Sequence, residues 1–379
     1  MSISPIPHKV RQILWAKSAG RCQYDGCNQP LYVDNLTKAE FNTSYIAHII
    51  ADQPKGPRGD EVLSEQLKSD ISNLMLLCDA HHRLIDKQEV EKHTVKLLTE
   101  MKRNHEERIE LLTEITPDKK SEIILYGANI GEHGGPLSYS ETANAITPEF
   151  YPAHSRPIEL NFKNSSFEDS MDAYWQIETE NLEIQFQNKI KPLISKEKRS
   201  HLSVFGLAPQ PLLIKLGTLI SDICPAEVYQ LHREPQTWRW LPHEQHFDFQ
   251  IFKPEKMHNQ IALVFSLSAD ISDQRITQTL ANDTSIWKMT IPNPHNDFLK
   301  SRDQLMQFRK TTRMLLNEIK KSHGEKGTIH VFPAMPVATA IELGRVWMPK
   351  ADLPLAIYDQ NTKKNGFIEA LKIQSKNDL

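Results

Sequence analysis

Four side chains with soft or borderline metal-binding atoms fall in two closely spaced pairs near the start of the chain. Four residues separate Cys22 from Cys27, and two residues separate Cys78 from His81. Zinc prefers four such ligands in a tetrahedral arrangement, and each close pair can converge from a single turn. A site of this kind joins two distant segments and so stabilises a small domain with a thin core. The spacing predicts structural zinc more strongly than the alternative of buried cysteines beside a surface histidine.

Three further polar side chains surround this predicted zinc site in the order His48, Asn73, His82. Cleavage of a phosphodiester needs a base that deprotonates water and a cation that neutralises charge on the phosphate and on the leaving oxygen. Histidine titrates near neutral pH and suits the first task, and Mg²⁺ or Mn²⁺ held by an imidazole suits the second. A single histidine on a strand is more often structural. The order of the three residues around the cysteines is what favours catalysis.

The elements that must position these residues can be predicted from periodicity and turn residues. We expect the following elements: a helix over 5–19, strands over 31–36 and 43–50, a polar Gly/Pro loop over 51–61, a buried strand or turn over 73–77, a helix beginning within 78–86, and a long amphipathic helix over 92–115. The residue composition changes near residue 118, where a polar segment is followed by a stretch rich in glycine. We therefore predict a first domain over 1–117, then a linker and the start of a second domain over 118–157, in which the apolar run IILY could form a strand.

From residue 158 to residue 379 apolar strands alternate with helical runs. The strand–helix pairs are 203–208 with 209–223, 261–269 with 270–281, and 328–335 with 336–348, and 353–360 closes as a strand. This alternation predicts an α/β domain with a largely parallel, covered sheet. Because the first two pairs resemble each other, we expect two related Rossmann-like halves in tandem.

The second domain contains no Walker loop and no Gly-x-Gly-x-x-Gly motif, which disfavours nucleotide triphosphatases and dehydrogenases. Sheets of this kind bind ligands at the carboxyl ends of their strands, here the loops 206–211, 266–270 and 332–336. Tryptophans beside Lys or Arg could stack on bases and pair with phosphates, although core packing is commoner for each tryptophan. The candidate ligand-binding residues are Gln210, Arg239, Trp240, Ser266, Ser268, Trp287, Lys288, Pro333 and Ala334.

Composition places limits on partners and compartment. The net charge is -3, and residues 1–116 hold 15 Lys and Arg against 17 Asp and Glu, so there is no overall basic surface for duplex binding. Any DNA contact must depend on a local basic patch, on bound metal or on several assembled copies. No secretory signal or membrane-length apolar run is present, and three of the four cysteines are explained as metal ligands. We expect a cytoplasmic protein without a membrane partner, in which Cys224 is a small buried residue.

The first domain resembles the HNH endonuclease family, whose fold is a ββα-metal unit, here with a zinc knuckle. The matching segments are AHI around His48, GPRG over 56–59, and NLMLLCDAHHRLID over 73–86. The resemblance implies that His48 is the general base, that Asn73 orients it or binds metal, and that His82 binds the catalytic Mg²⁺ or Mn²⁺. Many members place Asp directly before the base, where this chain has Ala47. The second metal ligand could therefore be Asn73, Asp52 or Asp86, and Lys55 and Arg58 are either phosphate contacts or solvated charges.

The segment HVFPAMPVATAIELGRVWMPKADLPLAIYDQ resembles the SAVED domain, a fusion of two CARF-like units; the match is strongest over 328–360 and looser over 158–290. An HNH nuclease followed by SAVED resembles effectors of cyclic-oligonucleotide antiphage signalling (CBASS). This implies activation by a cyclic di- or trinucleotide, ligand-promoted homo-oligomers, and degradation of double-stranded DNA. Two alternatives stay open, a modification-dependent restriction endonuclease and a non-catalytic zinc-knuckle docking module on a nucleotide-binding scaffold.

Overall fold

The structure is a computed structural model, and it describes residues 5–34, 36–129, 137–161, 167–171, 173–195, 200–242, 248–361, 363 and 366–374. The chain divides into an N-terminal unit, Met1–Thr116, and a C-terminal unit, Pro117–Leu379. The division lies beside the domain boundary expected from the sequence. Among the described residues, no helix combines the length and the apolar character needed to cross a bilayer.

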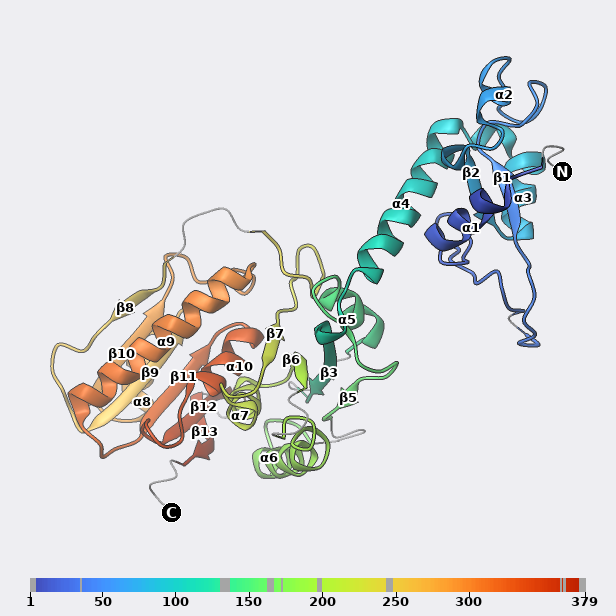
Figure 1. The fold of residues 1–379 in the computed structure, drawn as a ribbon. Helices are drawn as coiled ribbons and strands as arrows, with labels where there is room; N and C mark the ends of the chain where they lie inside the picture. Colours follow the sequence, from blue (N-terminus) through green and yellow to red (C-terminus); the bar gives the residue numbers. More distant parts are fainter. Residues whose placement is uncertain are drawn as a thin grey trace. The chain divides into compact units, whose positions relative to one another are not determined.

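The N-terminal unit is built around a short antiparallel hairpin that is covered by helices (Figure 1). Its elements are α1 (His8–Lys17), β1 (Tyr45–His48), α2 (Leu63–Leu67), η1 (Ile71–Asn73), β2 (Leu74–Leu77), α3 (Asp79–Arg83), η2 (Leu84–Gln88), η3 (Val90–Lys92) and α4 (Val95–Thr113). Every residue of β2 is fully buried, and Leu14 of α1, Ile85 and Leu98 of α4 pack in the same core. The helix expected at the start, the two hairpin strands and the long amphipathic helix are therefore confirmed.

The strand expected over 31–36 is wrong. The described residues of this segment make only an isolated bridge, between Val33 and Glu40. The reason is local, because the Asp34 carboxylate accepts hydrogen bonds from the backbone N–H groups of Leu36 and Thr37. An Asp side chain that satisfies the backbone in this way favours a turn over a strand.

The C-terminal unit contains two sheets. The first has the order β4–β3–β6–β7 with β5 also paired to β3, and the second has the order β13–β12–β11–β9–β10–β8. The strands and helices are η4 (Pro117–Lys119), β3 (Lys120–Gly127), α5 (Tyr139–Ile146), β4 (Tyr151–Pro152), β5 (Ile158–Glu159), α6 (Tyr174–Gln185), η5 (Phe186–Ile190), β6 (His201–Leu207), α7 (Gln210–Ile220), β7 (Ala226–Tyr229), β8 (Gln250–Phe252), β9 (Gln260–Ser266), α8 (Asp273–Thr279), β10 (Thr284–Thr290), α9 (Arg302–His323), β11 (Ile329–Ala334), α10 (Val337–Val346), β12 (Leu355–Asn361) and β13 (Gly366–Ile373). The parallel core of each sheet agrees with the expected α/β class.

The two sheets are built from the same run of elements. The run β3–α5–β5–α6–β6–α7–β7 corresponds in order and pairing to β9–α8–β10–α9–β11–α10–β12. Matched aromatic pairs support this equivalence, because Phe205 stacks on Tyr229 and Phe332 stacks on Tyr358, both with ring centroids 4.5 Å apart. The tandem halves exist, but the sequence paired the wrong segments: β6–α7 is equivalent to β11–α10, not to β9–α8. The strand expected from the apolar run IILY is confirmed as part of β3, so 118–157 holds the start of the second domain, and its linker part is shorter than expected.

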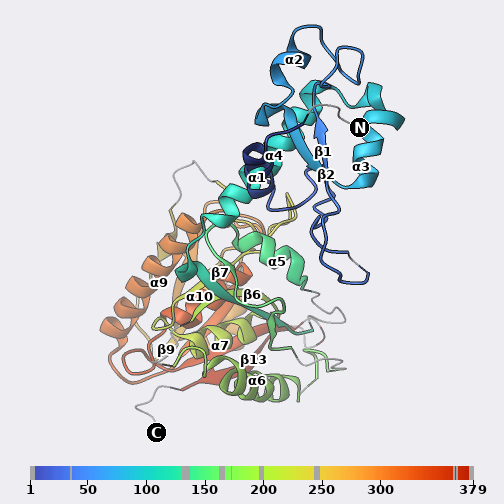
Figure 2. The same cartoon turned by 45° about the vertical axis from the view of Figure 1, so that its right-hand side comes forward.

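The two halves meet where α7 crosses α10 (Figure 2). Each helix carries the pattern Ile-x-Leu-Gly, ending at Gly217 in α7 and Gly344 in α10. A Cβ atom on Gly217 would lie 2.0 Å from the carbonyl oxygen of Ile341, and one on Gly344 would lie 2.0 Å from that of Ile214. The crossing therefore depends on two glycines that let the backbones touch.

Candidate functional site

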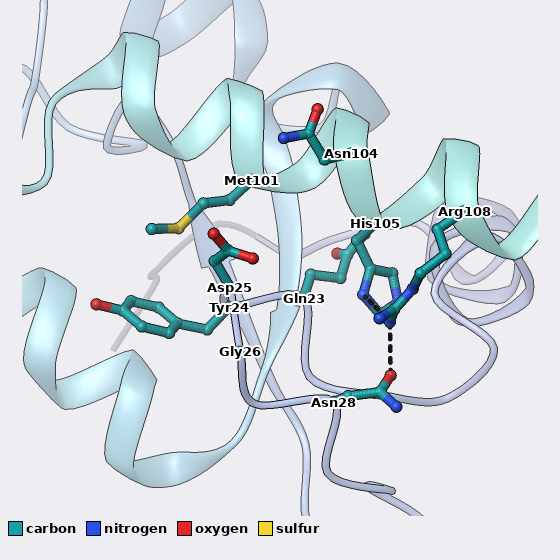
Figure 3. A pocket seen from close by; sticks show the side chains of 9 residues that line it. All are labelled: Gln23, Tyr24, Asp25, Gly26, Asn28, Met101, Asn104, His105 and Arg108. Atoms are coloured by element: carbon teal, nitrogen blue, oxygen red, sulfur yellow. Dashed lines mark hydrogen bonds between the residues drawn. The ribbon is translucent and has the colours of Figure 1, made fainter. Parts of the chain in front are cut away.

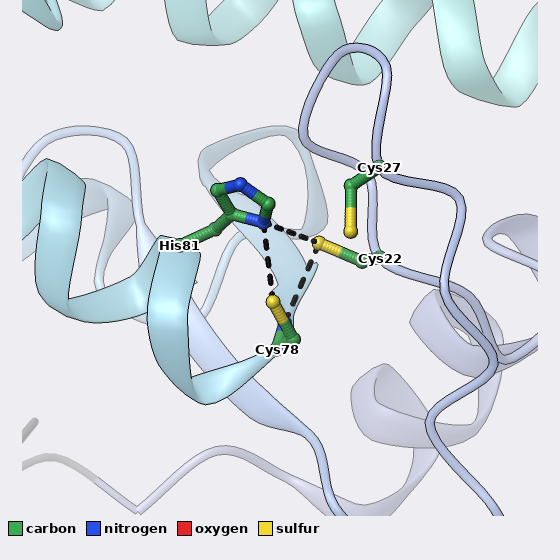
Figure 4. Close-up of side chains that lie close together, drawn as sticks. All are labelled: Cys22, Cys27, Cys78 and His81. Carbon is green, nitrogen blue, oxygen red and sulfur yellow. Dashed lines mark hydrogen bonds between the residues drawn. The ribbon is translucent and has the colours of Figure 1, made fainter. Parts of the chain in front are cut away.

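The four predicted zinc ligands come together between the turn after α1 and the start of α3 (Figure 4). The sulfur atoms of the three cysteines and Nδ1 of His81 all lie within 4.8 Å of one another. Nδ1 is 3.1 Å from Cys78 Sγ and 3.6 Å from Cys22 Sγ. Ligands at zinc–ligand distances near 2.3 Å in a tetrahedron would be separated by roughly 3.8 Å. The donor set and its spacing therefore fit a four-coordinate zinc ion.

Burial changes the protonation of the ligands in this cluster. Burial raises the pKa of the Cys22 thiol to about 12, so the thiolate form needs a nearby positive charge. Burial is also the largest cause of the lowered pKa of His81, which keeps its ring neutral and able to donate a lone pair. The Tyr24 ring stacks on His81 at 4.0 Å, and Tyr24 Oη lies 3.0 Å from Nε2 of His93. These contacts fix the orientation of the His81 ring.

Helix α4 is attached to the turn that carries Cys22 and Cys27 (Figure 3). Gln23 exchanges two hydrogen bonds with the backbone of Leu76 in β2, and its amide nitrogen donates to Glu106 of α4 at 3.2 Å. Arg108 donates to the side-chain oxygen of Asn28 at 2.7 Å across a cavity of about 220 Å³. The turn that carries Cys22 and Cys27 is therefore tied to β2 and α4 by polar contacts, of which the bonds of Gln23 are buried or half-buried and the Arg108–Asn28 bond is exposed.

His48 ends β1 and lines a separate cavity of about 270 Å³. Its side chain is largely buried, and Nε2 lies 2.9 Å from the carbonyl oxygen of Lys68. Because a carbonyl only accepts, Nε2 of the neutral ring carries the hydrogen and Nδ1 keeps its lone pair. A histidine fixed in this tautomer is suited to take a proton from water.

Asn73 does not line this cavity. Its side-chain oxygen accepts from the backbone N–H of Ile50 at 2.8 Å, and its nitrogen donates to the carbonyl oxygen of Ile50 at 2.8 Å and to that of Leu67 at 3.3 Å. Both amide atoms are thus engaged with the backbone that follows His48. The prediction that Asn73 binds metal is corrected, since the side chain holds the end of β1 in place.

His82 and Asp86 line the same cavity as His48, from α3 and η2. Nε2 of His82 lies 3.4 Å from Oδ2 of Asp86, and the His82 ring stacks on Tyr45 at 5.0 Å. Burial lowers the pKa of His82, while the Asp86 carboxylate acts in the opposite direction. Two ligand atoms bound to Mg²⁺ at 2.0–2.1 Å and at right angles would be about 3 Å apart. The pair therefore fits a divalent cation, with Asp86 as the second ligand and Asp52 on the cavity wall.

The Gly/Pro loop contributes differently from what the sequence suggested. The Arg58 side chain is only 6% exposed and bonds to the protein interior, so its assignment as a phosphate contact is corrected. Lys55 is exposed on the same loop, and the exposed Lys87 lines the cavity but was missed. Gly59 permits the tight turn, because a Cβ there would lie 2.4 Å from the carbonyl oxygen of Pro54.

A second cavity, of about 440 Å³, opens at the carboxyl ends of strands from both halves of the C-terminal unit. Its polar lining comes from the ends of β7 and β9 and from the loop before α9, namely Gln230, His232, Arg233, Gln236, Ser268 and Asn296. Asp297 accepts hydrogen bonds from the backbone N–H groups of Arg233 and Glu234 and thereby holds the loop that follows β7. An exposed guanidinium beside amide and imidazole groups can bind phosphate and base edges.

Of the nine residues predicted to bind a ligand, only Ser268 lines this cavity. Trp287 is buried and donates to His323, and the Ser266 hydroxyl accepts from the backbone of Ile271. Two of the others lie beside the cavity, because Gln210 bonds to the backbone of Met335 and Trp240 packs against His232. Pro333 and Ala334 lie within β11, and Arg239 is exposed but does not line the cavity. Lys288 pairs with Asp273 at another cavity, of about 760 Å³. The sequence missed Arg233 because it missed the short strand β7 that precedes it.

The C-terminal unit matches a known protein family. Residues 182–373 match the family described as SMODS-associated and fused to various effectors sensor domain (SAVED). No curated protein sequence matches the chain.

Solved structures with a similar chain course include two SAVED/CARF-domain receptors. The Cap4 receptor of Acinetobacter baumannii with the cyclic trinucleotide 2′3′3′-cAAA is 14% identical, with a TM-score of 0.43 over 82% of this chain. The Cap4 receptor of Moraxella osloensis is 12% identical, with a TM-score of 0.38 over 76% of this chain. The chain spans 60% of the first and 63% of the second. The family match covers more than half of the sequence, and the chain belongs to the SAVED sensor-domain family.

Proposed function

We propose that this protein is a metal-dependent HNH endonuclease that cuts double-stranded DNA when its SAVED unit binds a cyclic oligonucleotide. One observation carries the proposal: His48, His82 and Asp86 line a single cavity beside a Cys₃His cluster, on a chain that also carries a sensor domain. A base and a cation-binding pair in one cavity are the groups that phosphodiester hydrolysis requires.

In this mechanism His48 removes the proton from the attacking water through Nδ1. The hydrogen bond from Nε2 to Lys68 holds the ring, and the two Asn73 contacts with Ile50 hold the strand end that carries it. His82 and Asp86 hold the divalent cation, which when bound supplies positive charge to the scissile phosphate and the leaving oxygen. Lys87 on the cavity wall and the exposed Lys55 contact the flanking phosphates, and the Cys₃His cluster would hold zinc, which would keep α3 in place.

The activating ligand binds in the cavity of about 440 Å³ at the strand ends of the SAVED unit. Arg233 contacts a ligand phosphate, and the exposed Gln236 is placed to hydrogen bond with a base edge. Gln230 supports the cavity wall, because its side-chain amide bonds to the backbone of Leu231 and Ala338. The low basic charge of the chain agrees with gated binding, because DNA affinity would then require ligand-promoted assembly of several copies.

A plasmid-cutting assay tests the proposal. Full-length protein with Mg²⁺ is incubated with supercoiled DNA and a panel of cyclic di- and trinucleotides that includes 2′3′3′-cAAA and 3′3′3′-cAAA. We expect cutting with the correct ligand and a loss of at least about 100-fold in rate for His48→Ala, since general-base catalysis contributes 10²–10⁴-fold. His8→Ala, an exposed histidine of α1, is the matched control and should cut normally.

Three outcomes would contradict the proposal in different ways. Cutting without any ligand would remove the gating, and cutting that depends only on DNA methylation would favour a restriction enzyme. No cutting with any ligand, any divalent metal or any DNA would leave a docking module in place of a nuclease. Particle mass with and without the activating compound shows whether assembly accompanies activity.

A further inference from the structure

The guanidinium of Arg58 bridges the two segments that carry the proposed catalytic groups. Nε donates to the carbonyl oxygen of Ile49 at 2.7 Å, and Nη1 donates to that of Ile85 at 2.7 Å. Nη2 donates to the carbonyl oxygen of His48 at 3.3 Å and to Oδ1 of Asp86 at 2.6 Å. One side chain thus contacts the end of β1 and the turn η2 from opposite sides.

The chemistry of arginine suits this position better than that of lysine. A guanidinium presents five N–H donors in a rigid planar fork, and four acceptors surround it here. Lysine offers a point charge on a flexible stem, so it cannot satisfy three carbonyl groups and a carboxylate in these directions. The backbone of Arg58 has φ +58°, an uncommon conformation for a residue with a side chain, and the surrounding contacts maintain it.

The contact with Asp86 decides which carboxylate oxygen faces the cavity. Arg58 takes Oδ1, and this leaves Oδ2 on the side of His82, 3.4 Å from Nε2. If Arg58 released Oδ1, the carboxylate could rotate about its terminal bond and the ligand pair would lose its spacing. The same release would free the carbonyl groups of His48 and Ile49, so the base strand would lose its fixed distance from η2.

We propose that Arg58 is the positioning residue of the nuclease site, acting through Asp86 on the catalytic cation and through the backbone of His48 on the base. This role rests on the proposed nuclease function. The Arg58 side chain is only 6% exposed and bonds to the interior, so this role replaces the phosphate contact that its position in a glycine loop suggested. Replacing a residue that hydrogen bonds to a metal ligand commonly lowers metal affinity by 10–100-fold.

The test uses the full-length, zinc-loaded chain and measures Mn²⁺ binding by electron paramagnetic resonance together with the metal dependence of cutting. For Arg58→Lys we expect Mn²⁺ affinity to fall by about tenfold or more, with much of the cutting rate restored at high Mn²⁺. A purely structural role would instead lower the folded fraction without moving the metal constant. Arg83→Lys is the matched control, since Arg83 is exposed and pairs with Asp79 on α3.

A second variant keeps the proposal testable if Arg58→Lys does not fold. Arg58→Gln keeps Asp86 as a ligand but replaces the guanidinium with a shorter amide that has only two N–H donors, so it should weaken Mn²⁺ binding by at least as much as Arg58→Lys. Wild-type Mn²⁺ affinity in either folded variant, on a protein that cuts DNA, would overturn the positioning role alone. A wild-type protein that neither binds Mn²⁺ nor cuts DNA would overturn the nuclease function, and the role of Arg58 with it.

Discussion

The sequence predicts a metal site well where the ligands lie close together in one short segment. The pairs Cys22 with Cys27 and Cys78 with His81 could be read from the sequence, and the structure brings the four side chains together. Arg58 and Asn73 could not be assigned in this way, because their partners lie on backbone groups of segments distant in sequence. A charged residue in a glycine loop looks solvated until the fold shows what it contacts.

The zinc proposal predicts a measurable loss when one ligand is removed. Cys78→Ser should release zinc and lower the unfolding temperature of the N-terminal unit, because binding free energy at such a site is folding free energy. Metal content by atomic absorption and thermal unfolding of the full chain would record both effects.

Cys224→Ala provides the matched control, since Cys224 is buried in the core of the other unit. It should keep one zinc ion per chain. Equal zinc content in Cys78→Ser and the wild type would show that Cys78 is not a zinc ligand.

At the scale of elements, the sequence analysis missed strands for two reasons. β10 alternates between buried and half-buried residues, with Trp287 and Met289 on the side that faces α9, whereas the sequence analysis treated Trp287 and Lys288 as ligand-binding residues. β7 has only four residues, and β4 and β5 have two each. Short strands carry too little periodicity to be recognised, and tertiary pairing decides them. The long helices α4 and α7 were predictable because their apolar faces repeat over several turns.

The glycine crossing of α7 and α10 predicts a large effect from a single methyl group. Gly344→Ala would place Cβ 2.0 Å from the carbonyl oxygen of Ile214 and force the helices apart. We expect the unfolding free energy of the C-terminal unit to fall by roughly 2–4 kcal/mol, measured by urea denaturation.

Gly366→Ala, in β13, is the comparison, because the new Cβ would meet no atom within 4 Å. Its effect should stay within about 0.5 kcal/mol. Equal stability of the two variants would show that the helices separate without cost and that the crossing is not constrained.

For the whole molecule, the sequence indicated two units and a duplicated second unit, but not where the duplication begins. The first copy starts at β3, in a stretch whose glycines and proline suggested a linker. Only the pairing of β3 with β6 reveals that this segment completes a sheet. Pairing between distant strands is information that a single sequence without homologues does not contain.

The cavity of the SAVED unit predicts a simple stoichiometry. Its described lining comes from the end of β6, from the segments that follow β7, β9 and β11, and from the loop before α9, so the equivalent strands β12 and β3 contribute no described residue. Isothermal titration with the activating compound should therefore give one ligand per chain. Arg233→Ala should weaken binding by about 10–100-fold, as expected for loss of a charge-assisted hydrogen bond.

Arg239→Ala serves as the control, because Arg239 is exposed but does not line the cavity. It should bind the ligand as the wild type does. If Arg239 were essential and Arg233 dispensable, the ligand would bind near Arg239 and not in this cavity.

The repeated run of elements has a consequence for the symmetry of the ligand that we propose. In a homodimer the two subunits contribute the same residues to a site at their interface, because every substitution occurs in both subunits. Here both copies belong to one polypeptide, and Gln230 at the end of β7 stands where the second copy has Asp359. Each copy can therefore change independently of the other, so the ligand proposed for the strand ends need not be symmetric.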